Sequence, residues 1–351
     1  MPSAQYIDHL HAFRGFAILS VVGAHAWSFM IFWTGGLNVD GLKWLFWFTE
    51  TLFHGSTIYF AIISGLLFRL VLNSRAWSSF YQSKLGNVIL PYIVLSFVIT
   101  GLYWQYIIQS PDISNTFQDY VNVVLKNLPL GKVDIHFWYI PVLAFLFLIT
   151  PLLAWLQDKS NVVFIALILL PLVVSRSPFP DFIKPQSFAY FTGAYALGMA
   201  MGAHYDNVKA FIAARKLALA VVALVSSILL FLLYVNDYQP GSVYSVRQTL
   251  VYIQKVAICL LVLYWLFERE MRLPQWLMSL GTYAFAIFFL HVVFIGLVIQ
   301  NVREVLNASR SVELVALFGS VNFIVGIIGS MALAYVAKRL LGKHARKIVG
   351  A

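Results

Sequence analysis

The sequence predicts an all-α, polytopic membrane protein with ten transmembrane helices and with both chain ends on the cytoplasmic side. Hydrophobic residues make up 61% of the 351 residues, and charged residues make up only 11%. Soluble domains carry roughly a quarter charged residues, so this composition excludes a large soluble domain. The mean hydropathy is +0.82, and the apolar residues are grouped into segments long enough to cross a bilayer. The lipid bilayer is therefore the first partner that the sequence implies.

The net charge of +10 does not indicate a nucleic-acid partner. The basic residues lie in short loops between apolar segments, a pattern that belongs to membrane topology and not to a phosphate-binding face. The single cysteine, Cys259, lies inside an apolar run, so no disulfide is expected within the chain. The first apolar segment is too long for the h-region of a cleavable signal peptide and lacks a small-residue cleavage site.

The predicted spans follow one another without a linker or an internal repeat. Because nothing divides the chain, we expect residues 1–351 to form a single membrane-embedded domain. The fifth and sixth spans are the shortest, and PLVVSRSPFPDFIKP between them has the Pro and charge content of a loop. We place the ten spans at 12–33, 45–71, 86–108, 137–157, 161–175, 187–203, 214–235, 248–267, 278–300 and 312–337.

The distribution of basic residues sets the predicted orientation. With ten spans and the N-terminus inside, fifteen Lys and Arg residues lie on the cytoplasmic side and eight lie in the outer loops, while Lys255 lies within a span. The positive-inside rule therefore predicts that both ends of the chain are cytoplasmic. The fifteen are Arg14, Arg69, Arg75, Lys84, Lys159, Lys209, Arg215, Lys216, Arg269, Arg272, Lys338, Arg339, Lys343, Arg346 and Lys347.

The first span carries an arginine at its mouth and a histidine at its middle, in FRGFAILSVVGAHAWSFMIFW. Arg14 and His25 are eleven residues apart, which at ~100° per residue returns them to nearly the same helix face. The helical rise separates them by ~16 Å, so Arg14 lies at one membrane surface and His25 lies near the midplane. An imidazole at that depth is costly and is a functional candidate. The alternative is a histidine that only hydrogen-bonds a neighbouring helix.

Two further spans carry polar groups that match this histidine. Glu50 and His54 are four residues apart on one helix face, in the outer part of the second span. A carboxylate orients an imidazole and makes it more basic, as a general base requires, although such a pair also satisfies itself near the interface. His291 lies about thirteen residues into the ninth span, at the depth of His25. There is no HxxxH or HExxH spacing, so no metal site is expected.

Arg75, Lys84 and Lys255 lie apart from these histidines, and each has two interpretations. Arg75 and Lys84 lie in a cytoplasmic connection, where they bind a phosphorylated ligand or only set topology. Lys255 lies about eight residues inside the eighth span, which predicts burial in a polar cavity unless its side chain snorkels to the surface.

Aromatic residues open the fourth span at its outer end. His136, Trp138 and Tyr139 form either an interfacial aromatic belt or a stacking platform for a sugar ring. Pro141 and Pro151 in the same span predict a helix bent around a cavity.

Taken together, five stretches resemble the acyltransferase-3 family of integral membrane acyltransferases. LHAFRGFAILSVVGAHA is similar to the family's first span, with its arginine-ten-residues-histidine motif at Arg14 and His25. IYFAIISGLLF resembles the second-span "FFxISGfL" signature, SSFYQSKLGNVILPY the basic loop that closes on Pro91, FWYIPVLAFLFLITPLL the "WyL…fPll" span, and LGTYAFAIFFLH the span that ends in His291. These stretches occur in the family's order and cover most of the chain. Two positions depart from the pattern, since His11 replaces an aspartate and a pair of arginines is reduced to Lys84.

The resemblance implies an acyltransferase of a bacterial cytoplasmic (inner) membrane. Such an enzyme transfers an acyl group, typically acetyl from cytoplasmic acetyl-CoA, to a hydroxyl of a carbohydrate acceptor, for example an exopolysaccharide, an O-antigen, a glucan or a glycoside. In this interpretation the CoA phosphates bind Arg14, Lys84 and Arg75. His25 is then a general base or a transient acyl carrier, and His291 orients it or shares its role. Glu50 and His54 complete a polar route across the bilayer.

A transporter or flippase of a lipid-linked sugar or acyl intermediate is the alternative, because it also uses polar residues at the midplane. The lack of two repeated halves with broken, charge-lined helices argues against it. A structural membrane subunit would not explain two histidines at the midplane.

Overall fold

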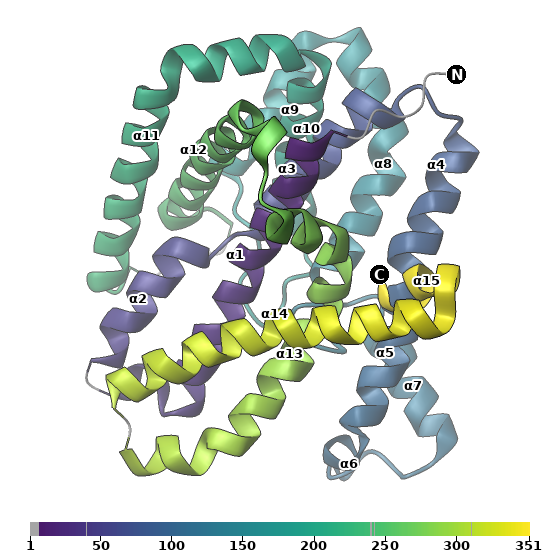
Figure 1. Ribbon diagram of the computed structural model, residues 1–351, viewed down its shortest axis with the longest axis vertical. Helices are drawn as coiled ribbons and strands as arrows, with labels where there is room; N and C mark the ends of the chain where they lie inside the picture. The colour runs from purple at the N-terminus through teal and green to yellow at the C-terminus, as the bar shows by residue number, and fades with distance from the viewer. Residues whose placement is uncertain (1–6, 40, 239–240, 242, 310) are drawn as a thin grey trace.

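The computed structural model describes residues 7–39, 41–238, 241, 243–309 and 311–351, and every regular element in these ranges is helical. Figure 1 shows their arrangement. The helices are α1 (Asp8–Trp33), α2 (Leu42–Phe53), α3 (Thr57–Leu67), α4 (Trp77–Lys84), α5 (Leu90–Leu102), α6 (Trp104–Ile107), α7 (Phe117–Asn127), α8 (Tyr139–Lys159), α9 (Asn161–Val173), α10 (Pro185–Ala203), α11 (Tyr205–Val235), α12 (Val246–Glu268), α13 (Gln275–Ser309), α14 (Val312–Leu341) and α15 (Ala345–Val349). Short 3-10 or π turns are η1 (Gly36–Asn38), η2 (Phe68–Leu72), η3 (Leu85–Ile89), η4 (Glu270–Arg272) and η5 (Gly342–His344).

Within the described ranges, eight helical segments are long and apolar enough to cross a membrane. This confirms the prediction of an all-α polytopic membrane protein. The predicted fifth span forms α9, which has only 13 residues, and the predicted sixth span forms α10, which is not among the eight. The count of ten spans therefore stays a prediction. The eight segments are Asp8–Trp33, Leu42–Leu72, Trp77–Leu102, Tyr139–Lys159, Tyr205–Val235, Val246–Glu268, Gln275–Leu306 and Val312–Val349.

Helix α1 lies at the centre of the fold. It packs against α13, α14, α2, α12 and α3, and its purple ribbon runs through the middle of Figure 1. Helix α11 forms one edge of the bundle and packs mainly on α12. Only 17% of the residues in its most apolar stretch are buried, as expected of a helix that faces lipid. Because α1 carries both Arg14 and His25, its central place surrounds these residues with protein on most sides.

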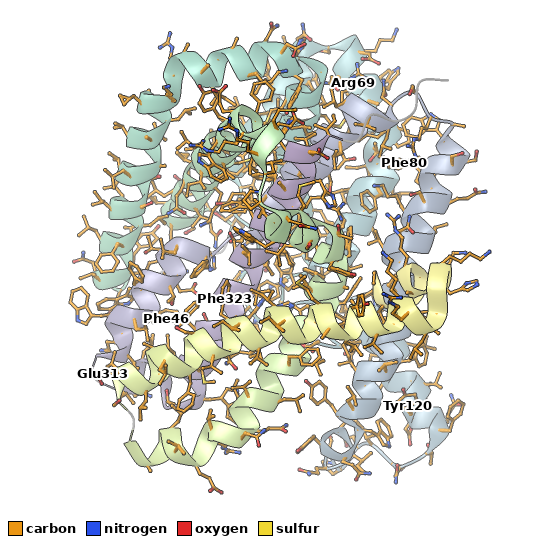
Figure 2. All side chains as sticks on the ribbon, viewed as in Figure 1. Phe46, Arg69, Phe80, Tyr120, Glu313 and Phe323 are labelled. Carbon is orange, nitrogen blue, oxygen red and sulfur yellow. The ribbon has the colours of Figure 1, made fainter. Side chains whose placement is uncertain are left out.

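Labelled residues from predicted cytoplasmic and outer segments lie toward opposite ends of the molecule, whereas α15, which is also predicted to be cytoplasmic, lies at mid-height in the same view (Figure 1). Figure 2 places Arg69 and Phe80, from segments predicted to be cytoplasmic, at the upper end, and places Tyr120 and Glu313, from outer segments, toward the lower end. Arg69 closes the upper end by donating to Asp158 at 2.5 Å, which joins η2 to the end of α8. Of the eight basic residues predicted to lie outside, Arg310 falls outside the described residues.

The predicted second span, 45–71, is broken into two helices. Helix α2 ends at Phe53 and α3 begins at Thr57, with Gly55 between them at a φ of +77° that a residue with a side chain rarely adopts. A Cβ atom at Gly55 would also lie 2.5 Å from Cγ1 of Val251 on α12. The break places His54 at the end of α2, where it points toward other loops and helices instead of continuing a straight span.

Lys255 and Gln254 on α12 satisfy the backbone at this break. Lys255 is fully buried, and its Nζ donates to the carbonyl of Leu52 at 2.6 Å. Gln254 Nε2 donates to the carbonyl of Thr51 at 3.0 Å. A helix end inside a membrane leaves carbonyl groups without helical donors, and each unsatisfied group is costly there. The buried lysine is thus explained by the broken helix, which the sequence interpretation of Lys255 did not include.

Helices α3 and α10 contact each other through their backbones. A Cβ atom would lie 2.1 Å from the carbonyl oxygen of Tyr195 if it were added to Gly65, and 2.0 Å from that of Ile62 if it were added to Gly198. Small residues allow this close approach, which is a common basis of helix association in membranes. We refer to this contact as the glycine seam.

The predicted orientation is tested by labelling single cysteines placed in exposed loops. In a Cys259→Ala background, we expect Ser114→Cys to react with an impermeant maleimide added outside spheroplasts and Lys343→Cys to react only after lysis. Both side chains are exposed, whereas the native cysteine is buried. Reaction of both positions from the same side would contradict the ten-span topology with both ends inside, because Ser114 and Lys343 would have to lie on opposite sides.

Candidate active site

The structure brings the two predicted midplane histidines into direct contact. His25 Nδ1 on α1 lies 3.0 Å from His291 Nε2 on α13, and their ring centres are 5.0 Å apart. His291 is fully buried, whereas His25 is partly exposed. Counting residues placed these two histidines at the same depth on separate spans, and in the structure a hydrogen bond joins them. Of the two residues, only His25 has exposed surface.

Backbone carbonyls define the hydrogen positions in this pair. His291 Nδ1 lies 2.8 Å from the carbonyl of Ile287 and 2.9 Å from that of Phe288. Since carbonyl groups only accept, Nδ1 must carry the hydrogen, and Nε2 of the neutral ring keeps its lone pair. His25 Nδ1–H then donates to His291 Nε2. This tautomer leaves the lone pair of His25 Nε2 available to accept a proton or to attack a carbonyl carbon.

A third imidazole lies beside the pair. The ring centre of His136 is 4.8 Å from that of His291 and 6.1 Å from that of His25. Asp134 Oδ1 approaches His136 Nδ1 to 3.4 Å, but neither ring nitrogen of His136 has a hydrogen-bond partner among the described residues. His136, Trp138 and Tyr139 are all buried, so the expectation of an interfacial aromatic belt is wrong for them. A buried imidazole without a partner is a costly group that a bound substrate or water would satisfy.

Glu50 and His54 belong to a second polar group, which we call the outer cluster: Glu50, His54, Arg176, Arg247 and Gln248. Glu50 Oε2 lies 2.7 Å from His54 Nδ1, and Arg176 Nη2 donates to His54 Nε2 at 2.6 Å. The lone pair of His54 Nε2 is therefore already engaged. Gln248 Nε2 lies 3.4 Å from the same nitrogen.

The outer cluster adjoins the histidines through α1. Ser28, one helical turn beyond His25, donates to Glu50 Oε1 at 3.2 Å. The predicted polar pair on the second span thus packs beside the histidines, on the side that the topology assigns to the outer membrane face.

The basic residues predicted to bind the donor gather at the opposite end of the bundle. The guanidinium of Arg14 lies 5.5 Å from the ring centre of Phe285, and the ammonium of Lys84 lies 4.5 Å from that of Phe147. Arg14, Arg75 and also Arg346 of α15 are close enough to act electrostatically on Lys84. We call these four residues the inner basic cluster. Such a group offers several donors to an anion with more than one phosphate.

The comparison with family models decides the family. The model of the acyltransferase-3 family, described as an acyltransferase domain, matches residues 7–339. The chain belongs to this family. It is therefore a membrane acyltransferase, as the five stretches in the sequence implied. Comparisons with curated proteins and with solved structures gave no match.

The structure gives a local reason for one departure of this acyltransferase from the family pattern. His11 stands where the family has an aspartate, and its Nε2 lies 3.0 Å from the carbonyl of Met278 and 3.1 Å from Thr282 Oγ1. A Cβ atom at Gly281 would lie 2.3 Å from the carbonyl of His11. The imidazole thus joins α1 to α13 where their backbones approach most closely, one turn before Arg14.

Several residues of the acyltransferase's site were not predicted from the sequence. Arg176 lies in the segment interpreted as a loop, and Arg247 and Gln248 begin a span without any motif. Asp134 was not predicted either, and His136 was predicted only as part of a belt or a sugar platform, although the two lie two residues apart directly before an apolar span. That spacing was the available signal, because polar residues at the start of a span need partners when they are buried.

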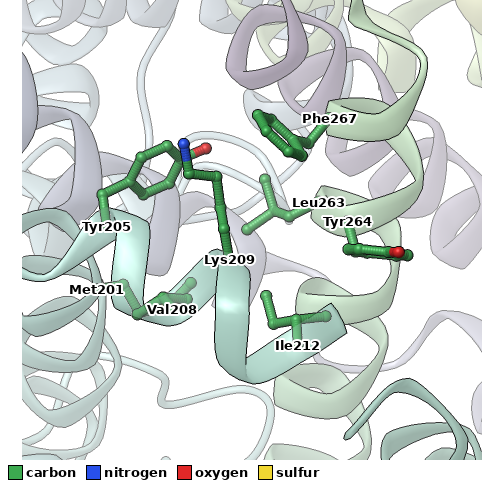
Figure 3. Close-up of a pocket in the computed structure, with 8 residues that line it drawn as sticks. All are labelled: Met201, Tyr205, Val208, Lys209, Ile212, Leu263, Tyr264 and Phe267. Carbon is green, nitrogen blue, oxygen red and sulfur yellow. The ribbon is translucent and has the colours of Figure 1, made fainter. Parts of the chain in front are cut away.

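A small pocket lies apart from all these residues, between α11 and α12 near the end of α10 (Figure 3). Mostly apolar side chains line it, and the amino group of Lys209 lies 5.1 Å from the ring centre of Tyr205 and 4.6 Å from that of Phe267. Its lining includes none of the seven predicted site residues, which are His25, His291, Glu50, His54, Arg14, Lys84 and Arg75. We assign it no part in acyl transfer.

Proposed function

We propose that this membrane acyltransferase moves an acetyl group from cytoplasmic acetyl-CoA to a hydroxyl of a carbohydrate on the outer side of a bacterial inner membrane. The observation that carries the proposal is the His25–His291 hydrogen bond, which leaves one reactive nitrogen on a partly exposed ring. The pair lies between the inner basic cluster and the outer cluster. An acyl donor bound at one end and an acceptor bound at the other would therefore meet at His25.

On the donor side, Arg14, Lys84 and Arg75 hold the phosphates of acetyl-CoA. Guanidinium groups bind phosphate through two parallel hydrogen bonds, and an ammonium adds a point charge. The aromatic rings beside Arg14 and Lys84 stabilise both cations while the donor is absent. The thioester then extends along α1 toward His25.

At the histidine pair, two routes are compatible with a free Nε2. As a general base, His25 takes the proton of the acceptor hydroxyl while the oxygen attacks the thioester carbon, and the departing CoA thiolate then takes this proton. As a carrier, Nε2 attacks the thioester and CoA leaves as the thiolate, after which the hydroxyl displaces the imidazole and the released imidazole passes the hydroxyl proton on to the thiolate. In both routes His291 orients His25, and Glu50 and His54 stand on the acceptor side. Rapid denaturation at neutral pH after addition of labelled acetyl-CoA without acceptor is expected to leave labelled protein only in the carrier route, and hydroxylamine is expected to remove that label.

The function is tested by comparing surface and periplasmic glycans from three strains by mass spectrometry. The wild-type strain and a deletion strain complemented with the native chain are expected to share a glycan that carries an acetyl increment. The deletion strain is expected to lack that increment. If all glycans of the deletion strain kept their acyl groups, the proposed carbohydrate acceptor would be wrong.

Replacing Arg14 by lysine is expected to raise the KM for acetyl-CoA about tenfold with little change in kcat. Lysine keeps the charge but loses the planar fork that binds phosphate through two hydrogen bonds. CoA release by purified protein in nanodiscs, measured against acetyl-CoA concentration, reports both constants. Arg215→Lys, at an exposed basic residue on the same predicted side, is the matched control. An unchanged KM in Arg14→Lys would leave Arg14 with a role in topology only.

A further inference from the structure

We propose that the outer cluster binds an acidic group of the acceptor, so that the acceptor is an anionic carbohydrate whose charge pairs with Arg176. This inference rests on the proposed function, because it assigns the outer cluster to the acceptor. It goes further by naming the chemical class of the acceptor and a residue that selects it.

The first observation is the charge balance around Arg176. Arg247 is a second guanidinium close enough to act on Arg176, and Glu50 is the carboxylate that acts on it. Glu50 is already bound to His54 at 2.7 Å, and the ion pairs among the described residues do not include Arg176. Among the described residues, Arg176 is thus acted on by a second cation and by one carboxylate that is already bound to His54, and it forms no ion pair of its own. An anionic ligand would supply a counterion.

The second observation is that Arg176 is held in place by its neighbours. Its guanidinium lies 5.5 Å from the ring centre of Trp138 and 6.0 Å from that of Phe182, and one of its terminal nitrogens donates to His54. Its Nε has no hydrogen-bond partner among the described residues. The group is therefore preorganised by aromatic contacts and one hydrogen bond, while part of its fork stays available for a carboxylate or a phosphate.

The third observation is a set of buried polar atoms around the same arginine. Among the described residues, hydrogen-bond partners are lacking for Gln248 Oε1, for Arg247 Nε and for the hydroxyls of Tyr190 and Tyr252. Gln248 is only 7% exposed and Tyr190 is fully buried. Buried polar groups are normally satisfied, and an orphan group costs about 1–3 kcal/mol. Sugar hydroxyls both donate and accept, so a carbohydrate is the ligand that would satisfy amide, guanidinium and phenol groups together.

The test measures binding to the purified full chain in nanodiscs without any acyl donor, by isothermal titration calorimetry. One pair of probes is tetragalacturonate and its methyl ester, and the other pair is maltose 1-phosphate and maltose. Within each pair the sugar is the same, and the members differ by methyl esterification or by a phosphate group, which changes the charge. We expect at least one charged probe to bind at least tenfold more tightly than its neutral counterpart. The pair of probes that shows this difference in affinity identifies the acidic group as a carboxylate or a phosphate.

Variants then connect this preference to Arg176. Arg176→Gln is expected to remove the preference for the charged probe, and Arg176→Lys is expected to retain part of it because the charge remains without the fork. Arg303→Gln is the matched control, since Arg303 also stacks on an aromatic ring, 5.1 Å from the centre of Trp33, but is exposed and remote from the outer cluster. Elution as a single peak in size-exclusion chromatography verifies that each variant is folded.

The proposal is contradicted if the native chain binds the charged and neutral probes equally, which includes binding none of the four. It is also contradicted if Arg303→Gln removes the preference as fully as Arg176→Gln does, because the effect would then be general surface charge. Binding is measured without acetyl-CoA, so these results can be interpreted even if the chain does not transfer an acetyl group. Failure of the proposed function and failure of this inference are therefore distinguishable.

Discussion

Replacing His25 by glutamine is expected to abolish acyl transfer while the protein stays in the membrane at its normal level. The glutamine amide can donate to His291 Nε2 as His25 Nδ1 does, so the contact between α1 and α13 is kept. An amide nitrogen has no basic lone pair and can neither accept the hydroxyl proton nor carry the acyl group. Loss of a general base lowers rates by about 10²–10⁴-fold, so we expect at least a hundredfold decrease in CoA release.

The matched control for this variant is His204→Gln, which removes an exposed imidazole at the end of α10. We expect His204→Gln to acylate at the native rate, with the amounts of both variants in the membrane compared by immunoblot. If His25→Gln protein, present at the native level, acylated as fast as the native chain, His25 would be a helix-packing residue only and the proposed role of the histidine pair would be wrong.

Replacing Gly198 by alanine is expected to cause the largest loss of stability of any single methyl addition in the fold core. The new Cβ atom would lie 2.0 Å from the carbonyl oxygen of Ile62, and this oxygen belongs to a helix backbone that has no flexible side chain to yield. Overpacking usually costs about 1–3 kcal/mol, and we expect a value above this range because two helices must separate. Fluorescence-detected size-exclusion chromatography after heating in detergent should show a lower midpoint temperature.

Gly86→Ala provides the control for the seam variant. Gly86 is also helical, but nothing lies within 4 Å of the position that its Cβ would take. Alanine is the better helix former by about 1 kcal/mol, so Gly86→Ala should be as stable as the native chain or more stable. Equal midpoint temperatures for Gly198→Ala and Gly86→Ala would contradict the tight contact between α3 and α10.

The matching heights of His25 and His291 could be predicted from the sequence because α1 and α13 are continuous helices. Counting residues gives depth reliably when each residue adds the same rise, so His25 and His291 were placed at one level. Their hydrogen bond required the relative rotation of two helices that are more than 260 residues apart in the chain, which no local pattern encodes.

The features that could not be predicted all arise where helices break or end. The second span was predicted as one continuous segment, whereas it breaks at Gly55 and leaves carbonyls that Lys255 and Gln254 satisfy. Arg176 lies in a connection without periodicity, so its approach to His54 depends entirely on the tertiary structure. His136 stands among aromatic residues, so the sequence indicates an interfacial belt or a sugar platform there, and neither alternative includes its place beside His25 and His291.

The glycine seam has a consequence for how the protein moves during turnover. Helices that touch through carbonyl oxygens and Cα atoms cannot slide or rock past one another by even about an ångström without losing their packing, because close-packed interiors do not deform continuously. Helix α3 is fixed to α10 in this way, and through Gly55 it is joined to α2, which carries Glu50 and His54. A transporter that exposes one site alternately to each side needs that kind of rocking. The glycine seam therefore predicts that α3 and α10 move as one unit during turnover.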